Sequence, residues 1–237
     1  MSKHGDNYNA KNATNLGHIM NKGVPIQVHH LISQSKYAAL KVEHKAMLCD
    51  AQYDIHDTDN LVGLPSTVAA ACQLEVQLHK GNHTGFGSED SYHETVQKEL
   101  REVFDEIDNN LKKHKCANND SEEEKKRKEK AYKKAYEAEV KQLKSKMIKI
   151  EKNMLKEIKA FTSILTAQAL FYKSGNVGCC GTSIGAATEN IAVSTLRTHA
   201  ATGTPCTPCT QSNRAGTHPI PHYMGVQVGG YELERGK

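Results

Sequence analysis

The feature that most constrains the fold is a long charged stretch with a regular apolar pattern. Between Tyr132 and Leu165, ten apolar residues recur at a mean step of about 3.7 residues, which is the period of an α-helix. Ser121 and Glu124 form a capping-box pair that can begin this helix. The step is nearer to an eleven-residue repeat than to a heptad, so a paired helix should lie nearly straight or coil slightly right-handed. The ten positions are Tyr132, Tyr136, Val140, Leu143, Met147, Ile150, Met154, Ile158, Phe161 and Leu165.

This stretch also concentrates positive charge. Residues 121–159 contain 14 Lys or Arg and 8 Glu, a local charge of +6, so a total of +4 leaves −2 on the rest of the chain. One interpretation is a helix with a packed or partner-binding face and a solvated Lys/Glu face. The other is that the excess Lys contacts a nucleic-acid backbone. Net charge therefore permits a polyanionic partner without requiring one.

Composition restricts the compartment and the size of the core. Hydrophobic residues make up 38% and aromatic residues 5% of the 237 residues, and Trp is absent, so part of the chain should be solvated or elongated. We expect no membrane span, because no apolar run approaches the roughly 18 residues that a membrane-spanning helix requires. The first residues lack the apolar core of a signal peptide, so we expect synthesis in a cytosol. The seven cysteines are odd in number and scattered, which favours free thiols or metal ligation over a disulfide framework.

Four regions follow from these composition shifts. Residues 1–22 are polar and Asn-rich, which predicts a flexible arm. Residues 23–117 have the pattern of a globular domain, and residues 118–173 form the long charged helix. Residues 174–237 hold 10 of the 17 glycines, 4 of the 6 prolines and 4 of the 7 cysteines, so we expect an irregular, turn-rich region of unknown role.

Within the globular region, the hydrophobic periodicity and the positions of Pro and Gly predict a small α+β unit. Pro65 should end the second strand, and Gly81 should end the helix that follows it. The expected elements are an extended run over 25–28, a helix over 37–48, a strand over 60–64, a helix over 68–80 and a helix over 91–115.

Histidines are distributed in an order that points to chemistry. His29 and His30 end the first extended run. Adjacent strand residues point to opposite faces, so one histidine can bind a metal ion while the other takes part in catalysis. His79 and His83 are four residues apart at the expected end of a helix, a spacing that lets two imidazoles share one cation. Asn60 begins the strand between them. This order predicts a strand, loop, strand and helix around one metal ion.

Residues 26–100 resemble the His-Asn-His, or ββα-metal, endonuclease superfamily, and more closely the bacterial toxin nucleases named after an Ala-His-His motif. The stretch from Gln27 to Ile32 is similar to that motif, with Val28 in place of Ala. Residues 54–65 resemble the family's Asn-containing second strand. Residues 78–83 and 92–96 resemble its metal-binding helix and the segment after it.

The resemblance implies a fold and a set of roles. The fold is a small ββα-metal core embedded in helices. His29, His79 and His83 would bind one divalent metal ion, with Mg²⁺, Zn²⁺ and Ni²⁺ as candidates. His30 would act as the general base toward water, and Asn60 would brace the loop that positions this base.

The same resemblance implies a substrate and partners. DNA is the expected substrate, because attack by water does not need a ribose hydroxyl, and the expected role is that of an antibacterial toxin or effector. His93 is a candidate phosphate contact. A cognate immunity protein and a secretion-apparatus or chaperone partner are expected, with synthesis in the bacterial cytoplasm and delivery by a specialised secretion system into the cytoplasm of a target cell.

The last region contains a separate candidate metal site. Cys206, Cys209, His218 and His222 have a spacing close to that of a structural zinc site, with a shorter middle spacer than zinc fingers have. A second, structural Zn²⁺ would help to fold a segment with few apolar residues. The alternative is a flexible tail with free thiols.

Two other functions stay open from the sequence. One is a metal-dependent RNase toxin, because phosphate contacts alone do not select the sugar. The other is a non-enzymatic coiled-coil interaction protein, in which the long helix oligomerises and the histidines hold a structural zinc. The metal and the oligomeric state are also left undetermined.

Overall fold

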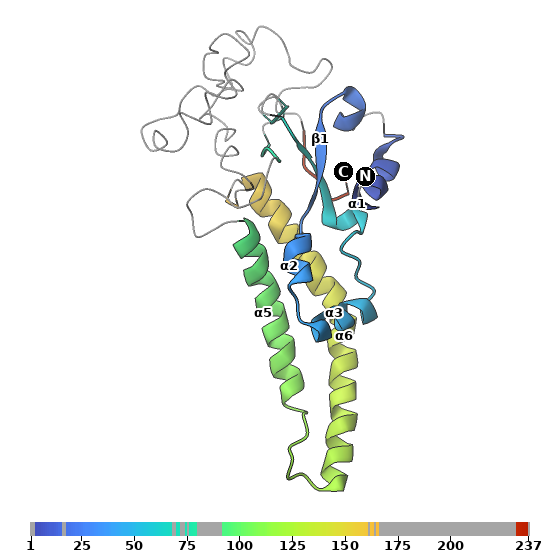
Figure 1. Cartoon of the computed structure of the whole chain (residues 1–237), viewed down its shortest axis with the longest axis vertical. Coiled ribbons are helices and arrows are strands. Elements are labelled where there is room, and N and C mark those ends of the chain that lie inside the picture. The colour runs from blue at the N-terminus through green and yellow to red at the C-terminus, as the bar shows by residue number, and fades with distance from the viewer. Residues whose placement is uncertain are drawn as a thin grey trace, which may run out of the picture.

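The computed structural model describes residues 3–15, 18–67, 70–71, 74, 76–79, 92–160, 162–163, 165 and 231–236. Within them the chain combines helices with one small two-stranded sheet (Figure 1), so the expected α+β class is confirmed at this level. The predicted character of 174–230 lies outside the described residues.

The sheet consists of β1 (Ile26–His30) and β2 (Leu61–Pro65), which pair antiparallel. The register sets Ile26 opposite Pro65 and His30 opposite Leu61. Pro65 has no backbone N–H to donate and stands at the end of the ladder, where this loss is tolerated. Every residue of β2 is buried, so the sheet holds the end of β1 against the core.

Two short helices follow β1 where the sequence predicts one. α2 (Gln34–Ala38) and α3 (Val42–Asp50) are separated by a turn, so the prediction of a continuous helix over 37–48 is wrong. Lys41 has an extended ψ of 151°, which interrupts the helix, and Lys45 donates to the Ala38 carbonyl oxygen at 2.6 Å. The break gives α2 and α3 separate packing positions.

The N-terminal region is more ordered than its polar composition predicts. Instead of a loose arm, it contains α1 (Lys3–Asn12) and a 3-10 helix, η1 (Ile19–Lys22). Tyr8 is fully buried and lies against β2, so close that a Cβ atom at Gly63 would overlap its hydroxyl group. Tyr8 and Gly63 therefore help to hold against β2 a helix that has almost no apolar face.

The long charged helix is α6 (Glu122–Ala160), which forms a hairpin with α5 (Tyr92–Lys112) (Figure 1). Both are shorter than the predicted ranges. The expected capping box is confirmed: Ser121 N donates to Glu124 Oε2 at 3.0 Å, and Glu124 N donates to Ser121 Oγ at 3.2 Å. The apolar stripe of α6 is buried against α5 and α3 in the same chain. Its fully or almost fully buried members include Leu143, Met147, Ile150, Met154 and Ile158.

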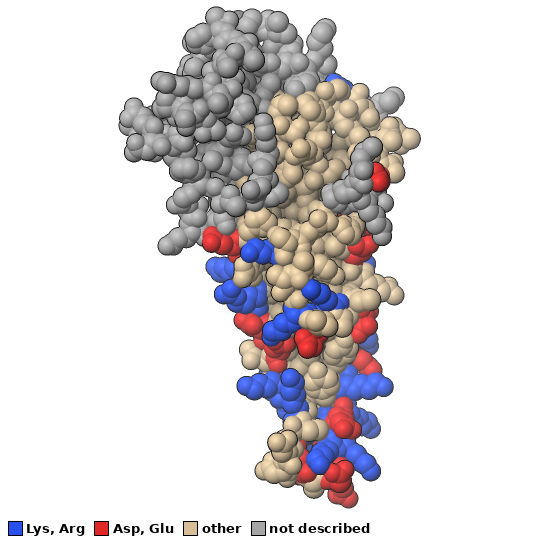
Figure 2. Space-filling view, in the orientation of Figure 1, with Lys and Arg blue, Asp and Glu red and all other residues tan. Residues whose placement is uncertain are grey.

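The outer faces of this hairpin carry Lys, Arg, Asp and Glu in mixture (Figure 2). Within the described part of the chain, no helix combines the length and the apolar character that a membrane span requires.

We expect Met147→Ala to lower the free energy of unfolding by about 2–5 kcal/mol, because Met147 is fully buried between the helices and its truncation leaves a cavity. Val42→Ala is the control, since Val42 is 77% exposed and its truncation should change stability by no more than about 0.5 kcal/mol. Urea denaturation followed by circular dichroism measures both. Equal effects of the two substitutions would contradict the assigned packing of α6.

Candidate functional site

The histidine pair at the end of β1 lies beside a cavity. His29 and His30 are buried, with 3% and 8% of their surface exposed. The cavity has a volume of about 350 Å³. Its lining residues are Val28, His29, His30, Ser33, Gln34, Ser35, His79 and His93. Four imidazoles from three separate parts of the sequence therefore surround one space.

His29 and His79 are direct neighbours in this cavity. Their ring centroids are 4.9 Å apart with an interplanar angle of 65°. His79 Nδ1 lies 3.0 Å from Gln27 Oε1, and Gln27 precedes His29 by two residues on β1. Because the amide oxygen can only accept, Nδ1 is the donor in this contact, and a neutral His79 ring then has its lone pair on Nε2. Gln27 thus selects the tautomer in which His79 can bind a metal ion through Nε2.

The backbone that carries His79 differs from the prediction. Ala70, Ala71 and Leu74 are helical, but residues 76–79 are not, so the expected helix over 68–80 ends before His79. Instead, the N–H group of His79 donates to the Pro65 carbonyl oxygen at 2.8 Å, which ties this segment to the end of β2. His83 lies outside the described residues, as do Cys206, Cys209, His218 and His222.

The described residues contain no group of three or more His, Cys, Asp or Glu side chains that could hold a metal ion. The pair of His29 and His79 nevertheless fits part of such a site. Imidazoles that bind one cation at about 2 Å have ring centres about 5 Å apart, close to the spacing of this pair. The hydrogen bond from His79 to Gln27 also has the form of the outer contacts that orient metal-binding imidazoles.

His30 has different neighbours. Its Nε2 lies 3.3 Å from His56 Nδ1, and the two rings meet edge to face with centroids 5.4 Å apart. Gln34 Nε2 lies 3.5 Å from the same His56 nitrogen. The sequence pattern did not identify His56 as a catalytic or metal-binding residue. Its only signal is its position four residues before Asn60, in a turn whose path the sequence pattern does not predict.

Asn60 is fully buried at the end of a 3-10 turn, η2 (Thr58–Asn60). Its Oδ1 accepts from Ile32 N at 2.8 Å, and its Nδ2 donates to the carbonyl oxygens of Ile32 at 3.3 Å and Ile55 at 2.9 Å. The amide therefore joins the turn before β2 to the residues that follow His30.

The start of α5 forms another wall of the site. Tyr92 is fully buried, its ring lies edge to face against His29, and its hydroxyl donates to the His30 and Leu31 carbonyl oxygens. Burial raises the pKa of Tyr92 well above its ordinary value, so the hydroxyl stays a donor. His93 Nδ1 lies 3.2 Å from Ser33 Oγ, and both residues line the cavity.

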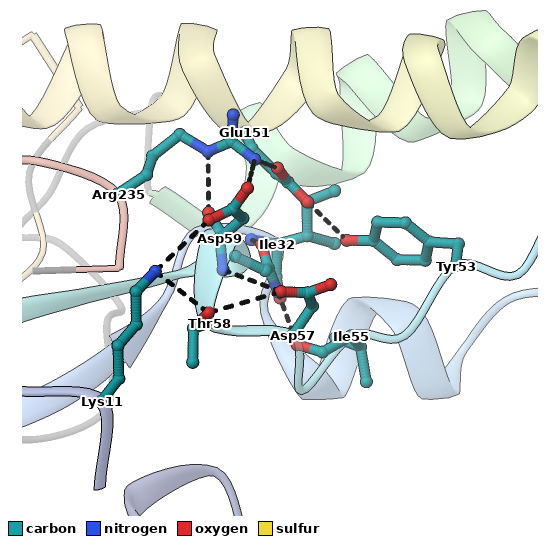
Figure 3. A network of polar contacts seen from close by, with 10 residues as sticks. Lys11, Ile32, Tyr53, Ile55, Asp57, Thr58, Asp59, Glu151 and Arg235 are labelled. Atoms are coloured by element: carbon teal, nitrogen blue, oxygen red, sulfur yellow. Dashed lines mark hydrogen bonds and ion pairs between the residues drawn. The ribbon is translucent and has the colours of Figure 1, made fainter. Parts of the chain in front are cut away.

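A polar network joins the Asn60 turn to α6 (Figure 3). Arg235 Nε donates to the Asp59 carbonyl oxygen at 2.7 Å, and Arg235 Nη2 forms an ion pair with Glu151 of α6. Glu151 also accepts from the Tyr53 hydroxyl at 3.0 Å. Burial raises the pKa of the Glu151 carboxyl group, and the neighbouring Arg235 and Tyr53 offset this rise only in part.

The segment 231–236 that carries Arg235 is itself held by the core. Gly236 N donates to the Leu61 carbonyl oxygen at 2.6 Å, and Asn12 Nδ2 donates to the Gly236 carbonyl oxygen at 3.1 Å. Tyr231 donates to the Gly63 carbonyl oxygen at 3.2 Å. Gly236 adopts a φ of +70°, a region that glycine enters without strain. The segment therefore bridges α1, β2 and α6.

A histidine pair at a strand end, a braced Asn beside it and a further histidine in the same cavity are typical of the HNH/ENDO VII nuclease superfamily. A model of the AHH family, a nuclease family of this superfamily with conserved AHH, matches residues 10–147. Because this match covers more than half of the 237 residues, the chain belongs to the AHH nuclease family, as its histidine motif predicted. Curated proteins and solved structures give no match. Nucleases of this superfamily generally use a divalent metal ion.

We expect Glu151→Gln to change the pH dependence of stability. Because the folded chain keeps the Glu151 proton to a higher pH than the unfolded chain, its stabilising contribution is complete below the ordinary pKa of 4.5 and is lost as pH rises through the folded value. The free energy of unfolding of the wild type should therefore fall relative to Glu151→Gln as pH rises from 4.5. Urea denaturation at a series of pH values measures it.

Glu137→Gln is the matched control, since Glu137 is exposed on the same helix. Its stability difference from the wild type should stay nearly constant with pH. A rise of wild-type stability relative to Glu151→Gln over the same range would show that the Glu151 pKa is lowered instead.

Proposed function

We propose that this chain is a metal-dependent endonuclease that hydrolyses phosphodiester bonds in DNA. The observation that carries the proposal is the side-by-side placement of His29 and His79 in a cavity that His30 also lines. Membership of a nuclease family supports the reaction class.

The proposed metal ligands are His29, His79 and His83. The first two have the required proximity, and Gln27 holds His79 in the tautomer that can bind through Nε2. His83 follows His79 by four residues and is proposed as the third ligand from the sequence. A bound divalent cation would stabilise the negative charge that develops on the phosphate during attack.

The proposed general base is His30. It accepts a proton from a water molecule whose oxygen attacks phosphorus, while the bond from phosphorus to the 3′ oxygen breaks and that oxygen takes a proton from solvent. His56 limits rotation of the His30 ring through its contact with Nε2. Asn60 and Tyr92 fix the backbone on which His30 stands, through bonds to Ile32 and to the His30 carbonyl oxygen. His93 is proposed to contact a phosphate oxygen.

We further propose that the nuclease acts as an antibacterial toxin or effector, with DNA as its target and a cognate immunity protein as its inhibitor. This biological role, and delivery by a secretion apparatus, follow from the likeness of the histidine motif to toxin nucleases. The packing of α6 against α5 within one chain accounts for the apolar stripe without a coiled-coil partner.

The catalytic proposal is tested with supercoiled plasmid. We expect the purified protein to nick and linearise it with Mg²⁺, EDTA to abolish cleavage, and His30→Ala to lower the rate by about 10²–10⁴-fold while metal binding is retained. A parallel incubation with RNA tests the choice of sugar. Full activity of His30→Ala would refute the base assignment, and intact plasmid in every lane would refute the nuclease.

The metal site has a test that does not depend on activity. We expect Gln27→Leu to weaken binding of Zn²⁺ or Ni²⁺ by about 10–100-fold, because His79 loses the acceptor that fixes its tautomer. Gln27→Glu keeps an acceptor oxygen and should bind at least as tightly as the wild type. Isothermal titration calorimetry measures both. Equal affinities for the Leu and Glu variants would rule out an orienting role for Gln27.

A further inference from the structure

A second cavity lies along α2 and α5, next to the cavity that His29, His30 and His79 line, which is called the catalytic cavity below. Its volume is about 300 Å³, and its lining includes Lys36, Gln97 and Arg101. The catalytic cavity is lined by Ser35 and His93. Ser35 is the residue before Lys36 on α2, and His93 lies four residues before Gln97 on α5. The two cavities therefore follow each other along the same pair of helices.

The walls of this second cavity carry positive charge that is only partly neutralised. Lys36 Nζ donates to Gln97 Oε1 at 2.8 Å, and this uncharged partner does not neutralise the ammonium group. Arg101 is exposed and forms no ion pair with any residue that the structure describes. Lys41 differs, because it pairs with Asp108 at 2.7 Å. Figure 2 shows Lys and Arg side chains, with Asp and Glu beside them, where α2 and α5 adjoin.

The spacing along α5 suits an extended ligand. His93, Gln97 and Arg101 follow each other at intervals of four residues, which places them on one face of the helix. At a rise of about 1.5 Å per residue, this row extends about 12 Å along the axis. One strand of a duplex presents a phosphate about every 3.4 Å along its axis, so the row can face several phosphates in succession.

His44 and Phe104 also line the second cavity, and their arrangement indicates which part of a nucleic acid this cavity can contact. His44 and Phe104 stack at 4.2 Å with an interplanar angle of 12°, but both are buried. No ring of this pair is available for stacking with a base. The groove offers cations and a shallow apolar surface, a combination that contacts the backbone without sequence selection.

We propose that the groove formed by Lys36 and Arg101 binds the phosphate backbone of the strand next to the scissile bond. The choice of nucleic acid as the ligand rests on the proposed nuclease function. Charge complementarity and continuity with the catalytic cavity support this occupant. Asp105, one turn beyond Arg101, lines the far end of the cavity and ends the track with a negative charge.

The test measures binding of a short fluorescein-labelled DNA duplex by anisotropy, in EDTA so that the duplex stays intact. We expect Lys36→Ala/Arg101→Ala to weaken binding about tenfold or more and to reduce the salt slope of log affinity by about 2, one for each lost phosphate contact. Asp105→Asn should strengthen binding. Lys126→Ala/Arg127→Ala is the matched control, because it removes the same charges from the exposed start of α6.

A second measurement separates the groove from the catalytic cavity. Hydrolysis of bis(p-nitrophenyl) phosphate needs only the catalytic cavity, so Lys36→Ala/Arg101→Ala should leave its kcat/KM unchanged while plasmid cleavage falls. The groove assignment is overturned by wild-type affinity and slope in this variant, by an equal loss in the control, or by an equal loss on both substrates. If the wild type cleaves nothing but the groove variant still loses DNA binding, the nuclease proposal fails and the groove assignment stands.

Discussion

The arrangement of the site depends on the side-chain amide of Asn60. It accepts one hydrogen bond and donates two, to Ile32 and Ile55, at a position with no solvent exposure. A carboxylate could not donate, and an apolar side chain would leave these buried backbone groups unpaired at a cost of about 1–3 kcal/mol each. Ile32, two residues after β1, and the turn before β2 are therefore fixed to each other, which holds the end of β1 that carries His29 and His30.

The support of Asn60 continues outward into parts of the chain that the family match does not include. Glu151 and Arg235 both lie beyond residue 147, where the match ends, yet they connect α6 to the carbonyl group of Asp59, next to Asn60. A buried ion pair contributes little net stability once desolvation is counted, but its loss on one side leaves an uncompensated charge. Through these two contacts, Arg235 joins the turn before β2 to α6.

Local patterns predicted the elements that have a strong period or a distinctive motif. The two strands, α5, α6 and the placement of His29 and His30 at the end of β1 belong to this group, whereas Asn60, predicted to begin the second strand, lies in η2 directly before β2. Long-range contacts were not predictable: Arg235 meets Asp59 across 176 residues, and His56 reaches His30 through an irregular turn. α1 was missed because its contacts with the core are made by residues far apart in the sequence: Tyr8 packs against Gly63 of β2, and Asn12 donates to the Gly236 carbonyl oxygen. His79 was predicted at a helix end, but residues 76–79 are not helical.

The alternation of side chains along a strand explains how adjacent histidines can have different tasks. On one side of β1, His29 meets the rings of His79 and Tyr92, which come from outside the hairpin. On the other side, His30 meets His56, which belongs to the connection between the strands. Both rings still border one cavity, because β1 ends there and α2 turns away. A shift of one residue in the register of β1 and β2 would exchange these neighbours, so the pairing of His30 with Leu61 fixes the chemistry as well as the fold.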